Sequence, residues 1–152
     1  MNRARIGIVG CGNISGIYLE NLQSFDETEI VAVADLDENR AKDQAATHGV
    51  DTVLTPTQLI ESDEIDIVLN LTTPHAHYEI AHLALSAGKH VYNEKTLTIS
   101  TKESRELIQL AKSNNLLLGC APDTVLGAGV QTARQAIDSG EIGDVVGYQA
   151  FM

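Results

Sequence analysis

The sequence predicts an α/β fold built on a doubly wound parallel sheet. Two observations support this prediction. Short apolar runs alternate with segments of helical periodicity along most of the chain. The apolar runs are nearly continuous, as in strands that are buried on both faces of a sheet. Strand–helix alternation at this spacing favours parallel pairing through right-handed crossovers, with helices on both faces.

The first half of the chain supplies three strands and three helices in this order. Asp37 is the expected N-cap of the second helix, and Gly49 is its expected stop. Thr55-Pro56 opens the third helix, because proline suits the first helical position. The predicted elements are strand 5–10, helix 13–25, strand 29–35, helix 37–49, strand 50–56 and a short helix that begins at Thr55-Pro56.

The second half continues the alternation. Pro74 starts a helix that Gly88 ends, and the pattern S-x-x-E at Ser100 and Glu103 predicts a capping box for the next helix. The predicted elements are strand 66–71, helix 75–87, strand 90–94, helix 100–113, strand 116–120, helix 129–139 and a last strand at 144–152.

Composition limits the possible functions. The chain has 152 residues, of which 43% are hydrophobic and 20% charged, as in an ordinary globular domain. A formal charge of −11 disfavours nucleic acid and anionic lipid as main partners. No apolar run is long enough for a signal peptide or a spanning helix. Cys11 and Cys120 lack metal-ligand spacing, and we expect them to be reduced core thiols in a cytoplasmic protein.

A glycine-rich turn, GCGNIS, follows the first strand at the edge where the carboxyl ends of all parallel strands meet. Gly10 permits a tight turn, and Gly12 allows a diphosphate to approach the backbone. The helix that follows directs its free N–H groups toward the phosphates. Ser15 replaces the usual third glycine or alanine and is small enough for helix–strand packing. The turn therefore predicts a Rossmann-type dinucleotide site, and the alternative is a glycine-rich turn without a ligand.

An acidic residue, Asp35, follows the second strand. A carboxylate at this place can accept hydrogen bonds from both ribose hydroxyls of an adenosine, and it repels a 2′-phosphate. Leu36 offers no phosphate ligand, which favours NAD over NADP, whereas Arg40 one turn later could cover the adenine or reach a phosphate. The alternative role of Asp35 is helix capping, for which Asp37 is better placed.

The segment TTPHAH follows the fourth strand. Thr72, Thr73 and Pro74 are expected to shape a loop over the cofactor, with one histidine facing it. A zinc site remains an alternative, since the side chains at positions 75, 79 and 82 (His, Glu, His) share one helical face. No further metal motif supports it, so we predict no metal.

An adjacent acid and base, Glu94 and Lys95, end the fifth strand on the same edge. The carboxylate can hold ribose hydroxyls, and the lysine can orient a substrate hydroxyl or act as acid or base. The alternative is a solvated, charged strand end.

These motifs resemble the glucose–fructose oxidoreductase/inositol dehydrogenase/MocA (Gfo/Idh/MocA) family of NAD(P)-dependent oxidoreductases. The similarity spans essentially the whole chain, and LTTPHAHYEIAHLALSAGKHVYNEK is its most specific segment. The resemblance implies that Lys95 is the functional, catalytic lysine near the point of hydride transfer. It also implies cofactor contacts from Gly10, Gly12, Asn13 and Ile14 at the turn, Asp35 and Arg40 at the adenosine, Thr73, Pro74 and His77 in the middle, and Glu94, Lys95 and Pro122 with Asp123 toward the nicotinamide.

Two departures from the family pattern stand out. Thr96 occupies the place of the proline in the family's Glu-Lys-Pro motif, which loosens the backbone after Lys95. The chain also stops about where the family's second α/β domain, with the substrate pocket, begins. We therefore expect a dinucleotide-binding domain at 1–143 and the start of a truncated domain at 144–152. The bare strand 144–152 is expected to self-associate or fray, and a homo-oligomer is expected.

The leading functional prediction is an NAD(P)-dependent oxidoreductase that transfers hydride between nicotinamide and a polyol or sugar-like substrate. This chain alone should bind the cofactor, NAD or alternatively NADP, with little turnover. A non-catalytic dinucleotide sensor or regulatory module on the same fold is the alternative. A methyltransferase is disfavoured, since the glycine turn and the Glu94-Lys95 pair would have no role in it.

Overall fold

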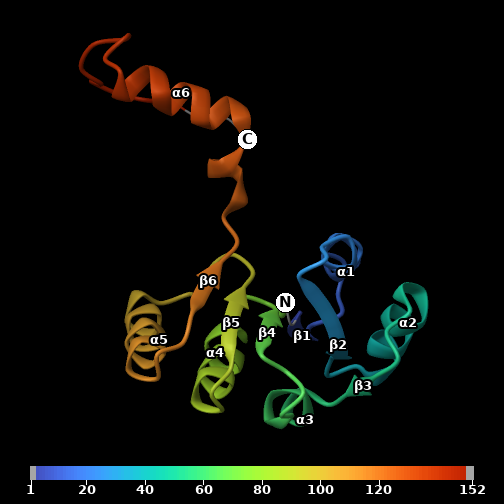
Figure 1. Ribbon diagram of the computed structural model, residues 1–152. Coiled ribbons are helices and arrows are strands. Elements are labelled where there is room, and N and C mark those ends of the chain that lie inside the picture. Colours follow the sequence, from blue (N-terminus) through green and yellow to red (C-terminus); the bar gives the residue numbers. More distant parts are fainter. Residues whose placement is uncertain (1–2, 150–152) are drawn as a thin grey trace. The chain divides into compact units, whose positions relative to one another are not determined.

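The computed structural model describes residues 3–149 as two compact units, divided between Ala121 and Pro122. The first unit contains a parallel sheet with helices on both of its faces (Figure 1). The second unit is a short helical segment.

The sheet has six strands in the order β3-β2-β1-β4-β5-β6, and every neighbouring pair is parallel. After β3 the chain returns to the middle of the sheet, so that β4 pairs with β1. This reversal is the point at which doubly wound sheets bind ligands, beyond the carboxyl ends of the strands. The predicted fold class is therefore confirmed. The strands are β1 (Ala4–Val9), β2 (Thr28–Ala34), β3 (Val53–Leu54), β4 (Ile67–Asn70), β5 (His90–Asn93) and β6 (Leu118–Cys120).

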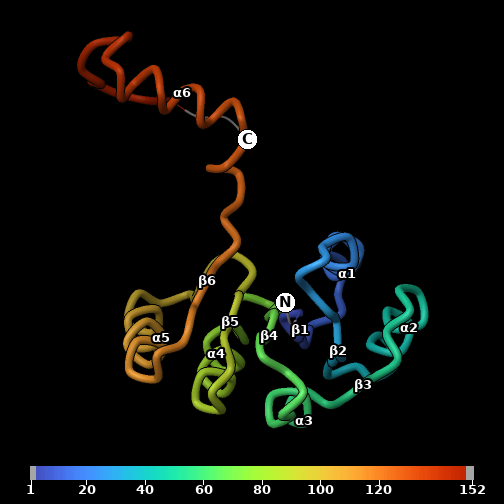
Figure 2. The backbone as a smooth tube through the Cα atoms, in the orientation of Figure 1, coloured from blue at the N-terminus to red at the C-terminus, as the bar shows by residue number. Residues whose placement is uncertain are grey.

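Helices cover the sheet in two layers, one on each face (Figure 2). One face carries α1 (Ser15–Gln23) and α2 (Glu38–His48), and the other carries α3 (Pro56–Glu61), α4 (His77–Ser86) and α5 (Thr101–Ser113). Alternate residues of the strands enter the two cores. In β1, for example, Ile8 packs in the core of the first layer and Val9 in that of the second. The continuous apolar runs of the sequence follow from this burial on both faces.

The predicted capping residues agree with the structure in three places and differ in one. Asp37 accepts hydrogen bonds from the first turn of α2, and Gly49 ends that helix in the left-handed conformation. Thr55 begins α3 with a capping box that includes Gln58. The capping box predicted at Ser100 is wrong, because the hydroxyl of Thr98 instead accepts the hydrogen bond of the Ser100 backbone N–H at 3.3 Å.

Two helices begin later than the sequence predicted. Helix α1 begins at Ser15 and not at residue 13, since the two preceding residues belong to the glycine turn. Helix α4 begins at His77, after a turn in which the Ala76 N–H donates to the Thr73 carbonyl at 2.8 Å.

The second unit consists, in its described part, of a 3₁₀ turn (Asp123–Leu126) and α6 (Ala128–Asp138), neither of which has a buried residue. The strand predicted at 144–152 is wrong for residues 144–149, which are not in a strand. A strand needs a neighbour to pair its backbone groups, and the described part of this unit offers none. Residues 150–152 lie outside the described range. The domain boundary at 143–144 and the self-association stay predictions.

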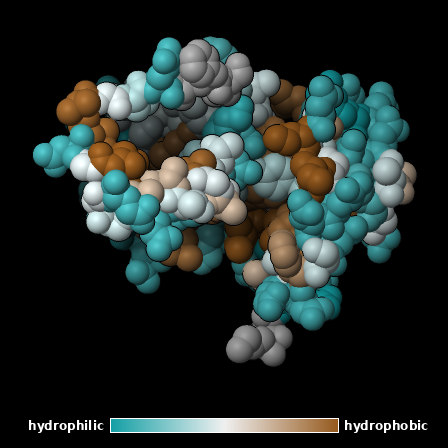
Figure 3. All heavy atoms as spheres, turned by 90° about the horizontal axis from the view of Figure 1, so that it is seen from above, coloured by the Kyte–Doolittle hydropathy of each residue, from teal (hydrophilic) through white to brown (hydrophobic). Residues whose placement is uncertain are grey.

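The surface is mixed in character. Figure 3 shows hydrophobic side chains scattered among hydrophilic ones on one face of the molecule. Large apolar side chains are exposed in both units, among them Leu36, Leu117, Val146 and Tyr148. Within residues 3–149, every helix is too short or too polar to cross a membrane.

Candidate functional site

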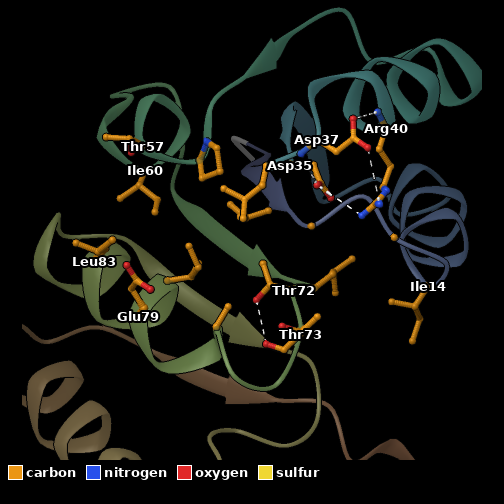
Figure 4. Close-up of a pocket in the computed structure, with 18 of the residues that line it drawn as sticks. Ile14, Asp35, Asp37, Arg40, Thr57, Ile60, Thr72, Thr73, Glu79 and Leu83 are labelled. Atoms are coloured by element: carbon orange, nitrogen blue, oxygen red, sulfur yellow. Dashed lines mark hydrogen bonds and ion pairs between the residues drawn. The ribbon is translucent and has the colours of Figure 1, made fainter.

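A cleft of about 830 Å³ opens at the carboxyl edge of the sheet, at the reversal between β1 and β4. It brings together the glycine turn, the end of β2, the loop after β4 and one side of α3 and α4 (Figure 4). Its lining residues are Val9, Gly10, Gly12, Asn13, Ile14, Asp35, Leu36, Asp37, Arg40, Pro56, Thr57, Ile60, Leu71, Thr72, Thr73, Ala76, Glu79, Ile80 and Leu83. Seven of the residues predicted to bind cofactor are among them: Gly10, Gly12, Asn13, Ile14, Asp35, Arg40 and Thr73.

The two glycines of the turn are needed for different reasons. Gly10 has φ +101°, and a Cβ there would lie 2.6 Å from the carbonyl carbon of Leu71. Both its conformation and the adjacent backbone therefore require glycine. Gly12 has no positive φ, and a Cβ there would meet no protein atom within 4 Å. The fold itself leaves the space above Gly12 open.

Ser15 completes the turn. Its backbone N–H and its hydroxyl both donate to the Gly12 carbonyl, at 3.1 and 2.7 Å. Its side chain is fully buried, so a small residue is required at the position where other glycine motifs have glycine or alanine. The hydrogen bonds fix the turn against the first residue of α1.

Asp35 connects the glycine turn to the start of α2. One carboxylate oxygen accepts from the Cys11 N–H at 2.7 Å, and the other accepts from the Asp37 N–H at 2.9 Å. The side chain is only 10% exposed and faces the cleft (Figure 4). Each carboxylate oxygen can accept more than one hydrogen bond, so both can still accept from a ligand. Burial, together with the nearby Asp35 charge, raises the pKa of the Cys11 thiol to about 11, which keeps it protonated.

Arg40 reaches the same corner of the cleft. Its guanidinium lies 3.7 Å from a carboxylate oxygen of Asp35 and 3.9 Å from one of Asp37. The side chain is about half exposed, and such long, exposed ion pairs contribute little to stability. The guanidinium can therefore move toward a ligand at small cost.

The loop after β4 and the start of α4 contain one predicted residue that lines the cleft and two that do not. Thr73 lines it, whereas Pro74 is exposed outside it. His77 is fully buried below the loop, where its Nε2 lies 3.0 Å from the Thr72 carbonyl oxygen and its Nδ1 contacts that of Thr96. His77 thus joins the loop after β4 to the loop after β5.

A pair of buried asparagines, which the sequence analysis did not single out, supports the same two loops. The Asn70 amide donates to the Asn93 side-chain oxygen at 3.0 Å, and the Asn93 amide donates to the Leu97 carbonyl at 3.0 Å. The Thr72 hydroxyl donates to the Asn70 side-chain oxygen at 2.6 Å. A polar residue at the end of an apolar strand was the available signal, since a buried amide must find partners.

Glu94 and Lys95 lie at the carboxyl end of β5, on the edge that carries the glycine turn but outside the cleft lining. The Glu94 carboxylate is partly exposed and accepts from the Tyr18 hydroxyl at 3.1 Å and from the Lys95 N–H at 2.7 Å. Lys95 is exposed. Thr96 follows through a cis peptide bond, and its hydroxyl donates to the Thr98 carbonyl at 3.1 Å. Hydrogen bonds thus hold the residue that replaces the family's proline.

The far wall of the cleft comes from α3 and α4 and was missed by the sequence analysis. Thr57 and Ile60 face it from α3, while Glu79 and Leu83 face it from α4 (Figure 4). The wall is mostly apolar with one carboxylate. Its formation depends on how α3 packs beside α4, which no local motif indicates.

Two other sequence-based expectations concern the alternative zinc site and Pro122. His75 precedes α4, so the three side chains of the zinc alternative do not share one helical face, and the described residues contain no group of three or more such side chains suited to a metal. Pro122 belongs to the second unit, where it precedes the 3₁₀ turn.

Comparison with protein families identifies one match over most of the chain. Residues 4–121 match the Gfo/Idh/MocA model, described as an oxidoreductase family with an NAD-binding Rossmann fold. The chain is similar to a myo-inositol 2-dehydrogenase of Thermotoga maritima, with 29% identity over 91% of this chain and 42% of that protein. It is also similar to the dTDP-3,4-didehydro-2,6-dideoxy-α-D-glucose 3-reductase of Saccharopolyspora spinosa, with 35% identity over 93% of this chain and 43% of that protein.

The chain is also similar to solved structures in fold and in sequence. The biliverdin reductase of Synechocystis sp. PCC 6803, solved with biliverdin and NADP+, superimposes with a TM-score of 0.85 and 34% identity over 93% of this chain and 44% of that one. The chain therefore spans less than half the length of the relatives that it matches.

Proposed function

Because the chain belongs to the Gfo/Idh/MocA family of oxidoreductases with an NAD-binding Rossmann fold, we propose that it is the cofactor-binding part of a dehydrogenase or reductase acting on a polyol or sugar-like alcohol. The cofactor would extend along the carboxyl edge from the cleft toward Glu94 and Lys95. We call Gly10, Gly12, Asp35 and Arg40 the adenosine end of this edge, and Glu94 with Lys95 the nicotinamide end.

The open space at Gly12 is the observation that carries this proposal. Glycine costs backbone entropy, and at this position neither φ nor any neighbouring atom requires it. A diphosphate that contacts the backbone at Gly12 would explain the missing side chain. The first turn of α1 follows directly, and its N–H groups and positive dipole end would bind the phosphate charges.

Asp35 would hold the ribose of the adenosine. Its carboxylate is already oriented by two backbone N–H groups, so little side-chain entropy remains to be lost on binding. The apolar wall of α3 and α4 would accept the adenine ring, with Ile60 and Leu83 available for contact.

We propose a preference for NAD over NADP. A 2′-phosphate at this position would lie beside the Asp35 carboxylate and would be repelled by it. The neighbouring Leu36 is 96% exposed and offers no hydrogen-bond donor from its side chain. Arg40 could offset part of this repulsion by moving from its long ion pairs, so we expect NADPH to bind weakly and not to be excluded.

At the nicotinamide end the residues of the chain would have separate tasks. When bound, the nicotinamide supplies the acceptor or donor of hydride. Glu94 would hold the ribose next to it, and Lys95, which is exposed, would orient the substrate hydroxyl and exchange a proton with it. The names of two relatives, an inositol dehydrogenase and a reductase of a nucleotide-linked sugar, support a polyol or sugar-like substrate.

The proposal is tested by calorimetric titration of the 152-residue chain with NADH and with NADPH, with Gly12→Ala and Gly16→Ala as matched variants. Gly16 lies in α1 four residues after Gly12, and a Cβ there would make only an ordinary contact, 3.7 Å from His48. We expect NADH to bind more tightly than NADPH. Gly12→Ala should weaken NADH binding at least about tenfold, because the methyl group would occupy the ligand's space, while the melting temperature should not fall.

Gly16→Ala should leave binding as it is. Absence of NADH binding by the unaltered chain, or equal binding by the Gly12→Ala variant, would contradict the proposal.

A further inference from the structure

Tyr18 connects the helix of the glycine turn to the nicotinamide end. It is the fourth residue of α1, one turn from the helix start, and its side chain is half-buried. Its hydroxyl donates a hydrogen bond to Glu94 Oε1 at 3.1 Å, across 76 positions of sequence. The contact therefore joins the two segments that the proposed function assigns to the diphosphate and to the nicotinamide ribose.

The backbone of Glu94 is fixed independently of Tyr18. Its N–H donates to the Asn70 carbonyl at 2.9 Å, and its carbonyl accepts a hydrogen bond from the Cys120 thiol at 3.7 Å. The carboxylate is held at each oxygen, by the N–H of its own loop at Oε2 and by Tyr18 at Oε1. Tyr18 thus contributes the contact between this carboxylate and α1.

We propose that Tyr18 is a positioning residue that fixes the Glu94 carboxylate for the ribose hydroxyls of the nicotinamide nucleoside. This inference rests on the proposed function. A carboxylate held at both oxygens keeps one rotamer, and its remaining lone pairs then have fixed directions. Since Tyr18 lies on the helix whose first turn faces the diphosphate, one rigid element would set both the phosphate position and the orientation of Glu94.

The molecule contains a matched pair for comparison. The Tyr78 hydroxyl donates to Glu106 Oε2 at 2.9 Å and so joins α4 to α5. Neither residue lines the cleft. Tyr78→Phe removes the same kind of hydrogen bond as Tyr18→Phe and controls for loss of helix packing.

The test compares NADH with ADP, which lacks the nicotinamide nucleoside. Tyr18→Phe should weaken NADH binding about fivefold, the equivalent of about 1 kcal/mol, and leave the dissociation constant of ADP unchanged. Tyr78→Phe should change neither value. In a Glu94→Ala background, Tyr18→Phe should have no further effect on NADH, because the carboxylate that it positions is gone.

The possible outcomes separate the two proposals. If the unaltered chain binds neither NADH nor ADP, the proposed function fails and this inference fails with it. If the chain binds both ligands but Tyr18→Phe weakens them equally or not at all, the proposed function stands and the positioning role of Tyr18 is overturned. Additive effects of Tyr18→Phe and Glu94→Ala would also overturn it.

Discussion

The two ends of the carboxyl edge are held in place by different kinds of contact. At the adenosine end, Asp35 and the glycine turn are fixed by backbone N–H groups from neighbouring turns. At the nicotinamide end, Glu94 is oriented by its own loop and by a side chain from a distant helix. The adenosine end is therefore fixed by backbone donors, whereas the nicotinamide end depends on a contact between side chains and lies more open to solvent.

The substitution expected to disrupt the adenosine end most is Gly10→Ala. The new Cβ would overlap the Leu71 backbone, 2.6 Å away, and φ would remain at a value that alanine disfavours. We expect the free energy of unfolding to fall by about 3 kcal/mol or more, with loss of NADH binding. Chemical denaturation measures the first effect, and Gly16→Ala should show no loss. A Gly10→Ala variant as stable as the unaltered chain would show that the turn can rearrange.

The loops of the nicotinamide end depend on the buried His77. His77→Phe keeps a ring in the core but leaves the carbonyl groups of Thr72 and Thr96 without this partner. We expect a loss of about 2 kcal/mol in the free energy of unfolding, because a partly buried carbonyl group that loses its hydrogen-bond donor is costly. His82→Phe, at an exposed position of the same helix, should cost much less. Equal losses in thermal or urea unfolding would show that His77 does not hold the loops.

A comparison of the carboxylates of Asp35 and Glu94 tests whether the two ends contribute differently to NADH binding. Asp35→Asn should weaken NADH binding about tenfold, and Glu94→Gln about threefold, because a hydrogen bond at a buried carboxylate competes less with water. Only 10% of the Asp35 side chain is exposed, while Glu94 is partly exposed. Titration calorimetry gives both values, and a larger loss for Glu94→Gln would reverse the comparison.

The smallest expected effect is on stability alone, at the opposite edge of the sheet. A change there should leave cofactor binding at both ends of the carboxyl edge as it is. The Arg5 guanidinium donates to Asp66 and lowers the pKa of its carboxyl group to about 2, below the usual 3.8. A lowered pKa in the folded state stabilises the protein above about pH 4, and this contribution is lost as the pH falls toward 2. Because the pair is partly exposed to solvent, Asp66→Asn should cost less than about 1 kcal/mol at pH 7.

Unfolding curves at several pH values test this prediction. The stability difference between Asp66→Asn and the unaltered chain should shrink between pH 4 and pH 2, and NADH binding at pH 7 should not change. A difference that is constant with pH would show that the hydrogen bond, and not the charge, matters.

The same contrast explains how much the sequence could predict. The doubly wound parallel sheet followed from periodicity and crossover rules, and the glycine turn, Asp35 and the Asp37 cap followed from residues close in sequence. The Tyr18–Glu94 contact, the asparagine pair and the wall formed by α3 and α4 join segments that are distant in sequence. Periodicity assigns such residues to helices and strands but carries no information about their partners.

His77 and the segment 144–149 show two further limits. A histidine near a cofactor loop has the same sequence signature whether it faces the ligand or supports the loop from below, and here it is fully buried. An apolar run with β-branched residues predicts a strand only if a partner strand is available, because strand formation is decided by pairing. The orientation of the histidine and the presence of a partner strand both depend on other parts of the chain, and the local sequence does not indicate them.

The empty space above Gly12 has a consequence for protein engineering. Replacing glycine by alanine at an unstrained position usually stabilises a protein by about 0.4–1 kcal/mol, since the unfolded chain loses conformational freedom. Gly12 meets that condition, because a Cβ there has no neighbour within 4 Å. A laboratory selection for heat resistance alone would therefore favour alanine here. The melting temperature would not reveal the loss of binding. Thermostabilised variants of this chain therefore need a separate screen for ligand affinity.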